Sequence, residues 1–223
     1  MNVNTFRNMS YGLYVVSSLD GDRPVGCIAN SIMQITASPA TVAVSLNHDN
    51  YTNDCVAKTG KFAFSILSEK SEPSIIGGFG FRSSRDNDKF AEVPHVMKEG
   101  LPVLTDSCGY VVCKVLKTME TETHTVFLGE VIDADVLDES APAMTYAYYH
   151  NVIKGTSPKN APTFLQEDKP AAKETAVEEP TAEKKVGRWQ CQVCGYIYEG
   201  EALPKDYTCP ICGQGADKFM KIE

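Results

Sequence analysis

Short runs of apolar and β-branched residues recur along the N-terminal part of the chain. They cover residues 11–19, 24–36, 41–47, 62–67, 109–121 and 124–136. Runs of this length, rich in Val, Ile and Phe, are typical of strands, and the first ends in Asp20-Gly21, a pair that favours a tight turn. Six strands at this spacing predict a mainly β fold, and we expect a closed antiparallel barrel.

Two short helices are expected between these strands. One is predicted over residues 51–59, because Gly60 follows it and glycine readily ends a helix. The other is expected after Ser71-Glu72-Pro73, because proline is tolerated in the first helical turn.

The polar stretch at residues 161–187 divides the chain. From Gln166 to Val186 it consists largely of Ala, Glu, Lys, Pro and Thr, with almost no large apolar side chain. Such a segment buries too little surface to offset its ordering entropy, so we interpret it as a charged, flexible linker. The predicted organisation is a body at residues 1–160, a linker at 161–187 and a small tail at 188–223.

Charge and hydropathy exclude several classes of function. The net charge is −8 over 223 residues, which argues against nucleic acid as a partner. No apolar run approaches the roughly 20 residues that span a bilayer, and the N-terminus lacks the pattern of a signal peptide. We therefore expect a cytoplasmic protein without a membrane partner, in which Cys27, Cys55, Cys108 and Cys113 are free thiols.

The other four cysteines predict a metal site in the tail. Cys191, Cys194, Cys209 and Cys212 form the pattern C-x2-C-x14-C-x2-C, and a glycine follows the second cysteine of each pair. Two such pairs can face each other across one tetrahedral ion. Four thiolates suit zinc or a single iron, and coordination alone slightly favours zinc.

The residues around these cysteines resemble rubredoxin, the one-iron electron carrier. The resemblance rests on Trp189, on residues 191–198 and 209–213, and on Asp217-Lys218-Phe219. It implies iron, with Trp189, Tyr196 and Phe219 as a small aromatic core. The segment 199–208 is shorter than in free-standing rubredoxins, and Tyr207 stands where they usually have Trp. We expect the short segment to leave the metal exposed, and accessible to two surfaces in turn.

The run Gly77-Gly78-Phe79-Gly80-Phe81 is a weak candidate for a phosphate-binding loop. It follows no strand–helix–strand pattern, and Ser83 occupies the position of the third glycine. A dinucleotide-binding fold is therefore not expected.

The body as a whole resembles the flavin reductase family. The resemblance is carried by residues 26–31, 45–47 with 51–52, 79–80, 89–90, 100–104 and 124–131, and residues 154–162 resemble the C-terminal arm of one branch of the family. It implies an FMN-binding split β-barrel that forms a homodimer and takes electrons from NADH or NADPH. Glu122-Thr123 stands where the family has Gly-Asp before its histidine, and Ile28 stands where many members have Thr.

The resemblance also implies the cofactor site. The predicted FMN-binding residues are Cys27, Ile28, Ala29, Asn30, Ser31, Ser45, Leu46, Asn47, Tyr51, Thr52, Phe79, Gly80, Arg85 and Lys89. Amide and hydroxyl groups suit the ring edge and the phosphate, and a cation suits the phosphate charge. His124 is the expected catalytic residue near the nicotinamide. Each residue also has a simpler interpretation: a strand-end cap, a turn residue, a solvated loop cation or a surface histidine. Cys27 is expected to be a small apolar side chain.

Three functions remain open at this point. In the first, the chain resembles the flavin reductase–rubredoxin fusions of anaerobic bacteria, which implies electron transfer from NAD(P)H through FMN and iron to an acceptor such as a flavodiiron protein. In the second, a flavin reductase carries a structural zinc tail. In the third, the body is a flavin carrier that is reduced by another protein.

Overall fold

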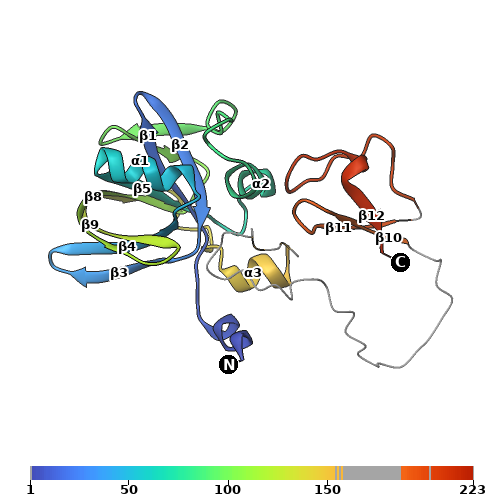
Figure 1. The fold of residues 1–223 in the computed structure, drawn as a ribbon, viewed down its shortest axis with the longest axis horizontal. Helices are drawn as coiled ribbons and strands as arrows, with labels where there is room; N and C mark the ends of the chain where they lie inside the picture. Colours follow the sequence, from blue (N-terminus) through green and yellow to red (C-terminus); the bar gives the residue numbers. More distant parts are fainter. Residues whose placement is uncertain (1, 154, 156, 158–186, 201, 223) are drawn as a thin grey trace.

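The computed structural model describes residues 2–153, 155, 157, 187–200 and 202–222 (Figure 1). Seven strands of the body form one antiparallel sheet in the order β2-β1-β5-β8-β9-β4-β3. Their bounds are β1 Tyr14–Asp20, β2 Arg23–Ala29, β3 Ile32–Ala37, β4 Ala40–Asn47, β5 Lys61–Ile66, β8 Gly109–Glu120 and β9 His124–Val136. The mainly β prediction is confirmed, and all six predicted runs contain strands.

The barrel is open on one side, which corrects the expectation of a closed one. The predicted strand at 24–36 is two strands, because β2 pairs with β1 and β3 pairs with β4, at opposite ends of the sheet. The chain passes from one end to the other at Asn30 and Ser31. There the Ser45 amide donates to the Ser31 carbonyl at 3.0 Å. The split β-barrel implied by the family resemblance is the fold observed.

Apolar side chains fill the barrel from most of its strands. Val16, Val44, Phe62 and Phe127 are fully buried there. The cluster also contains Cys27, Ala29, Val42, Leu46, Val56, Phe64 and Cys113. Alternation along β1 sends Val16 into this core and Val15 to the opposite face. Both faces of β1 are buried, so Tyr14, Val15 and Val16 follow one another without polar alternation. The next two residues, Ser17 and Ser18, are buried as well, and their hydroxyls donate to backbone carbonyls.

A second core lies between the outer face of β1 and two helices, α2 (Pro73–Phe81) and α3 (Tyr146–Asn151). Its buried members are Leu13, Val15, Leu67, Ile75, Ile76, Phe79, Phe90, Leu104, Met144 and Tyr149. Tyr146 and Tyr148 pack against it half-buried. These tyrosines of the body are therefore packing residues.

The helix termini follow the expected sequence signals. Helix α1 spans Tyr51–Thr59, as predicted, and Gly60 ends it at φ 68°. The Asn50 side chain caps its start by accepting from the Thr52 amide at 3.1 Å. Pro73 occupies the first turn of α2. The glycine run 77–80 lies inside this helix, so it forms no phosphate loop.

A hairpin of β6 (His95–Lys98) and β7 (Leu101–Leu104) was not predicted as such. Glu99 and Gly100 form its turn with φ values of 49° and 83°. Four-residue strands are too short for their alternation to be recognised in the sequence.

The tail forms a three-stranded sheet of β10 (Gly187–Cys191), β11 (Ile197–Gly200) and β12 (Phe219–Lys221). Two 3-10 helices complete the described elements, at Val3–Asn8 and Ala216–Lys218. The predicted linker and most of the arm at 154–162 lie outside the described residues, so the domain bounds 1–160, 161–187 and 188–223 stay predictions. No described helix is both long and apolar enough to cross a bilayer.

Candidate functional site

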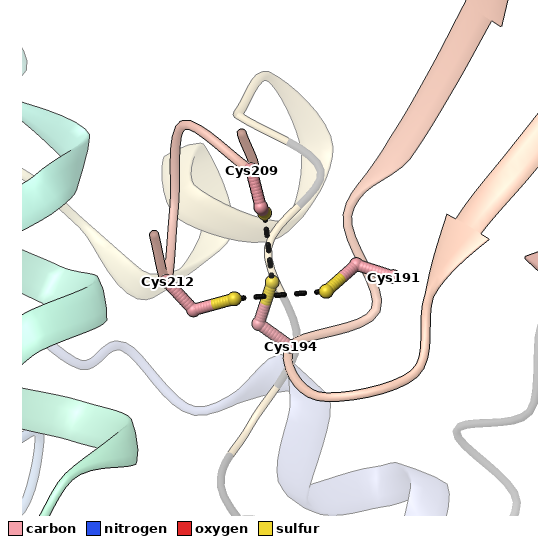
Figure 2. A group of neighbouring side chains, drawn as sticks. All are labelled: Cys191, Cys194, Cys209 and Cys212. Carbon is pink, nitrogen blue, oxygen red and sulfur yellow. Dashed lines mark hydrogen bonds between the residues drawn. The ribbon is translucent and has the colours of Figure 1, made fainter. Parts of the chain in front are cut away.

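Four cysteines of the tail converge on one point. The Sγ atoms of Cys191, Cys194, Cys209 and Cys212 all lie within 4.8 Å of one another. Figure 2 draws two of the contacts, Cys191–Cys212 at 3.6 Å and Cys194–Cys209 at 3.5 Å. Sulfurs at about 2.3 Å from one ion, arranged as a tetrahedron, lie about 3.8 Å apart. The four sulfurs therefore fit a single four-coordinate metal ion.

Each cysteine pair is held by the same tight turn. The amide of Gly195 donates to the Cys191 carbonyl, and the amide of Gly213 to the Cys209 carbonyl, both at 2.9 Å. The two glycines have φ values of 77° and 68°, which side-chain-bearing residues rarely adopt. The glycine after each second cysteine is thus needed for the turn.

The electrostatics of the sulfurs call for a cation. Hydrogen bonding to Cys194 lowers the pKa of Cys209 to about 5 and raises the pKa of Cys194. Burial raises the pKa of Cys212 to about 11. Without a metal ion, a neighbouring thiol stabilises the thiolate of Cys209, and burial disfavours the charged form of Cys212. A bound metal cation is therefore needed to balance the charge when all four cysteines are thiolates.

The metal site is covered, which corrects the expectation of an exposed one. Cys191, Cys194 and Cys209 are 1% exposed, and Cys212 is 3% exposed. Ile211 belongs to the same buried cluster, and Tyr196, Phe219, Phe81 and Ile153 pack against it. Phe81 and Ile153 come from the body, so the body supplies part of the cover of the metal site.

The aromatic core of the tail differs in part from the prediction. Trp189 packs on Tyr198 at 5.9 Å between ring centroids, Tyr198 on Tyr207 at 4.6 Å, and Tyr207 on Phe219 at 5.3 Å. Tyr198 and Tyr207 thus belong to this core. Tyr196 instead packs against the cysteine cluster. Alternation explains the difference, because Tyr198 pairs with Trp189 across β10 and β11.

In the body, several predicted flavin residues meet where β3, β4 and β9 run side by side. Asn47 and His124 are direct partners across β4 and β9. Ser45 lies two residues before Asn47, so it is on the same face, and its amide bonds to Ser31. Asn30 is 5% exposed. One polar group is therefore formed by the residues at positions 30, 31, 45, 47 and 124. Their spacing in the sequence does not by itself show that they meet.

A second group surrounds the start of α1. The Arg85 guanidinium lies over the Tyr51 ring at 4.6 Å, and its Nη2 is 3.4 Å from Asp54 Oδ2. Tyr51 donates its hydroxyl proton to Asp20 at 2.8 Å. Thr52 is fully buried in the first turn, and none of the residues that the structure describes satisfies its Oγ1 with a hydrogen bond.

Lys89 and Cys27 lie behind this group, in the interior. Lys89 Nζ donates to the carbonyls of Gly26 and Phe79 at 2.9 and 3.1 Å, and burial lowers the pKa of this lysine to about 8. Burial raises the pKa of Cys27, although the Lys89 charge opposes the shift. Cys27 is thus an unreactive core thiol, as expected.

The remaining predicted positions can offer mainly backbone groups to a ligand. Ala29 and Leu46 point into the barrel core, and Ile28 packs half-buried against the second core. Gly80 lies in α2 next to Phe79, whose side chain is 2% exposed.

Two unsatisfied polar atoms in the described part of the body suit a polar ligand. Thr52 Oγ1 lies in the first turn of α1, where a helix start favours an anion such as phosphate. His124 Nε2 is also buried without a partner, while Nδ1 lies 2.8 Å from the Thr123 hydroxyl. A flavin mononucleotide has a phosphate and polar ring edges that such groups can satisfy. The residues present therefore fit the cofactor.

Comparisons with known proteins agree with both sites. Residues 6–157 match the model of the flavin reductase like domain, and residues 189–220 match that of the rubrerythrin, rubredoxin-like domain. The chain belongs to the flavin reductase family of oxidoreductases and carries a C-terminal rubredoxin-like domain. The matches assign a flavin to the body and a four-cysteine iron centre to the tail.

Two relatives are 40% identical to this chain. One is the high molecular weight rubredoxin of Moorella thermoacetica, aligned over 100% of both chains. The other is the ferric-chelate reductase (NAD(P)H) of Archaeoglobus fulgidus, which covers 74% of this chain and 99% of its own. The first shares both domains, whereas the second corresponds to the body.

Among solved structures, the NADH:FAD oxidoreductase SgcE6 of Streptomyces globisporus superposes with a TM-score of 0.59 at 26% identity. The match covers 64% of this chain and 84% of the other. The FMN-binding protein of Thermus thermophilus superposes with a TM-score of 0.58 at 21% identity, over 63% and 83% of the two chains. The second likeness supports the fold alone.

The partly buried position of His124 predicts a specific pH dependence of stability. Burial, reinforced by nearby His48, lowers the pKa of His124. The unfolded chain therefore binds a proton at higher pH than the folded one, and stability falls as the pH drops below about 6.5. We expect His124→Gln to lose less stability than the parent protein between pH 7.5 and pH 5, as measured by urea unfolding. Equal losses in the two proteins would contradict this.

Proposed function

We propose that this chain transfers electrons from NADH or NADPH, through FMN held by the body, to an iron ion held by the tail cysteines, and then to an acceptor redox protein. FMN suits this role because it accepts a hydride and releases single electrons. The observation that carries the proposal is the presence of a flavin reductase fold and a four-thiolate centre in one chain. We further propose that the acceptor is a flavodiiron protein and that the chain acts in the cytoplasm.

The chain's residues would divide the work at the flavin as follows. Thr52, the start of α1 and Arg85 bind the phosphate, with Tyr51 supporting the arginine. Asn30, Ser31, Ser45 and Asn47 present amide and hydroxyl groups to the ring, and His124 stands beside Asn47 where the nicotinamide enters. Lys89 places a positive charge behind the site and fixes the Gly26 and Phe79 carbonyls. Backbone groups at Cys27, Ile28, Ala29, Leu46 and Gly80 complete the pocket.

A homodimer is part of the proposal, because the face that carries Ser45 and Asn47 also exposes large apolar side chains. Met33 on β3 is 65% exposed and Met119 on β8 is 59% exposed. Met33 pairs with Ala43, and Met119 with Val126, so both methionines lie on the face of Ser45. A second copy covering this face would shield the methionines and enclose the ring site. Sedimentation equilibrium tests this, and a monomer at micromolar concentration would refute it.

An anaerobic titration tests the electron path. NADH or NADPH is added to the purified chain, and the visible spectrum is followed. We expect the flavin absorbance to bleach and the red iron chromophore to fade in the same experiment. Zinc in the tail with an active flavin would support a reductase with a structural metal. A flavin that responds to a reduced protein but to neither nicotinamide would support a flavin carrier.

A cut within residues 170–180 should separate the two halves of the reaction. Tethering keeps the tail at high effective concentration near the flavin. We expect cleavage at an inserted protease site to leave flavin reduction unchanged, and to make iron reduction slower and dependent on protein concentration. Stopped-flow spectroscopy measures both rates, and the uncleaved variant is the control. Iron reduction at an unchanged rate in dilute cleaved protein would refute the tethering argument.

A further inference from the structure

The second cysteine turn of the tail lies against α2 of the body. Arg82 Nη2, just after α2, donates to the Cys212 carbonyl at 3.2 Å. Phe81 and Ile153 of the body pack against the buried cluster of Ile211 and the four cysteines. Figure 1 shows α2 as the element of the body that faces the loops of the tail. The two domains therefore meet through residues 209–213, which we call the docked turn.

Gly77 allows this contact because it has no side chain. It is buried in α2, and a Cβ atom built on it would overlap the carbonyl oxygen of Ile211. The next residue, Gly78, has open space where its Cβ would be. A side chain at Gly77 would therefore collide with the tail, whereas a side chain at Gly78 would not. This gives a structural role to a glycine run that forms no phosphate loop.

Arg82 adds a hydrogen bond and a positive charge to the contact. Its guanidinium donates to a backbone carbonyl of the metal-binding turn and lies 3.0 Å from where a Cβ on Gly213 would be. An iron ion bound by four thiolates has a net negative charge in either oxidation state, so a nearby guanidinium attracts it. Gly213 needs its positive φ for the turn, and its lack of a side chain also leaves room for Arg82.

The opposite turn of the metal centre faces away from this contact. In the first cysteine turn, Gln192 is exposed and Val193 is 42% exposed. Cys191 and Cys194 are nonetheless buried just beneath these side chains. The centre therefore has one covered turn and one turn that is open to another protein.

We propose that Gly77 of α2 and Arg82 just after it form a docking site within the chain for the docked turn, residues 209–213. We also propose that electrons enter the metal centre at this contact. The exposed turn at Gln192 and Val193 is then the surface offered to the acceptor protein. The role in electron entry rests on the function proposed above, whereas the docking itself does not. Helix α2 suits the role because Phe79 and Gly80, two and three residues after Gly77, belong to the predicted flavin set.

Matched alanine variants test the docking. Both Gly77→Ala and Gly78→Ala add one methyl group to the same helix and favour helix formation equally. Because the added methyl group overpacks the contact, we expect Gly77→Ala to lower the equilibrium constant for docking roughly ten- to hundredfold. Gly78→Ala should leave this constant unchanged. Arg82→Glu, at an exposed position, removes the hydrogen bond and reverses the charge without touching the helix interior.

Paramagnetic broadening reports the docking without any turnover. NMR spectra of the full chain are compared with zinc and with Fe(III) in the tail. In the docked chain, Fe(III) broadens the amide signals of residues 77–82 beyond detection. We expect this in the parent protein and in Gly78→Ala, and expect the signals to persist in Gly77→Ala and Arg82→Glu. Signals that persist in the parent, or equal broadening in the two glycine variants, would overturn the docking.

The role in electron entry has a separate readout. In stopped-flow experiments we expect Gly77→Ala to keep the parent rate of flavin reduction by NADH or NADPH and to slow iron reduction at least tenfold. An unchanged rate of iron reduction in a variant that NMR shows to be undocked would overturn this role. If the parent chain does not reduce its iron at all, the proposed function fails while the NMR result still decides the docking.

Discussion

We expect Cys194→Ser to release the metal and unfold the C-terminal domain while the flavin domain stays folded. The four sulfurs lie within 4.8 Å of one another, so losing one breaks a closed coordination shell. Metal binding supplies on the order of 10 kcal/mol to the folding of small four-ligand domains. In the described part of the tail, the few aromatic contacts are too small a core to replace that contribution. Metal analysis and the fluorescence of Trp189, the single tryptophan of the chain, measure the effect.

Cys108→Ser is the matched control. Cys108 is a half-exposed free thiol of the body, so its replacement should leave metal content and Trp189 fluorescence unchanged. Flavin absorbance in Cys194→Ser should equal that of the parent protein, because the second core of the body does not depend on the tail. A metal content in Cys194→Ser equal to that of the parent would contradict the four-ligand site.

Thr52→Val should weaken FMN binding while stabilising the flavin-free protein. The Thr52 hydroxyl is fully buried in the first turn of α1, and within the described residues no hydrogen bond satisfies it. Removing such a group takes away a desolvation cost of about 1–3 kcal/mol. A hydrogen bond to a charged phosphate contributes about 1.5–3 kcal/mol, so its loss raises the Kd for FMN roughly ten- to hundredfold. Fluorescence titration with FMN and urea unfolding of flavin-free protein measure the two effects.

The opposite signs of these effects make the prediction specific. Thr52→Ser keeps the hydroxyl and should bind FMN with nearly the parent affinity. The hydroxyl lies close enough to Cys27 to lower the pKa of that thiol, so a purely structural role is the competing explanation. A destabilised Thr52→Val protein with unchanged FMN affinity would support that explanation and refute the phosphate role.

Features that depend on local sequence were predicted accurately. The two C-x-x-C pairs, each followed by glycine, specify their own turns, because the donor, the acceptor and the positive φ all lie within five residues. Helix α1 runs from Tyr51 to Thr59 as predicted, since Asn50 and Gly60 cap it from adjacent positions. Several of the longer strands can also be recognised from their composition, as β5, β8 and β9 can.

Features that depend on distant contacts were missed or wrong. The four-residue strand β7 is buried because Leu101 and Val103 pack against residues of β5 and β8, whereas its partner β6 is half-buried or exposed. A short sequence window does not reveal this packing. Tyr198 joins the aromatic core of the tail because β11 pairs with β10 in one register out of several possible ones. The break at Asn30 follows from pairing β2 and β3 with opposite ends of the sheet.

The sequence by itself therefore determined the four metal ligands, the family of each domain and the polar residue types available to a flavin. Only the tertiary structure decided that the barrel is open between β2 and β3, that Asn47 stands beside His124, and that the metal centre is buried. It also placed Gly77 against Ile211, more than a hundred residues away in the chain. The physical reason is range: turns and caps are specified by neighbouring residues, whereas burial and docking depend on surfaces that exist only after the chain has folded.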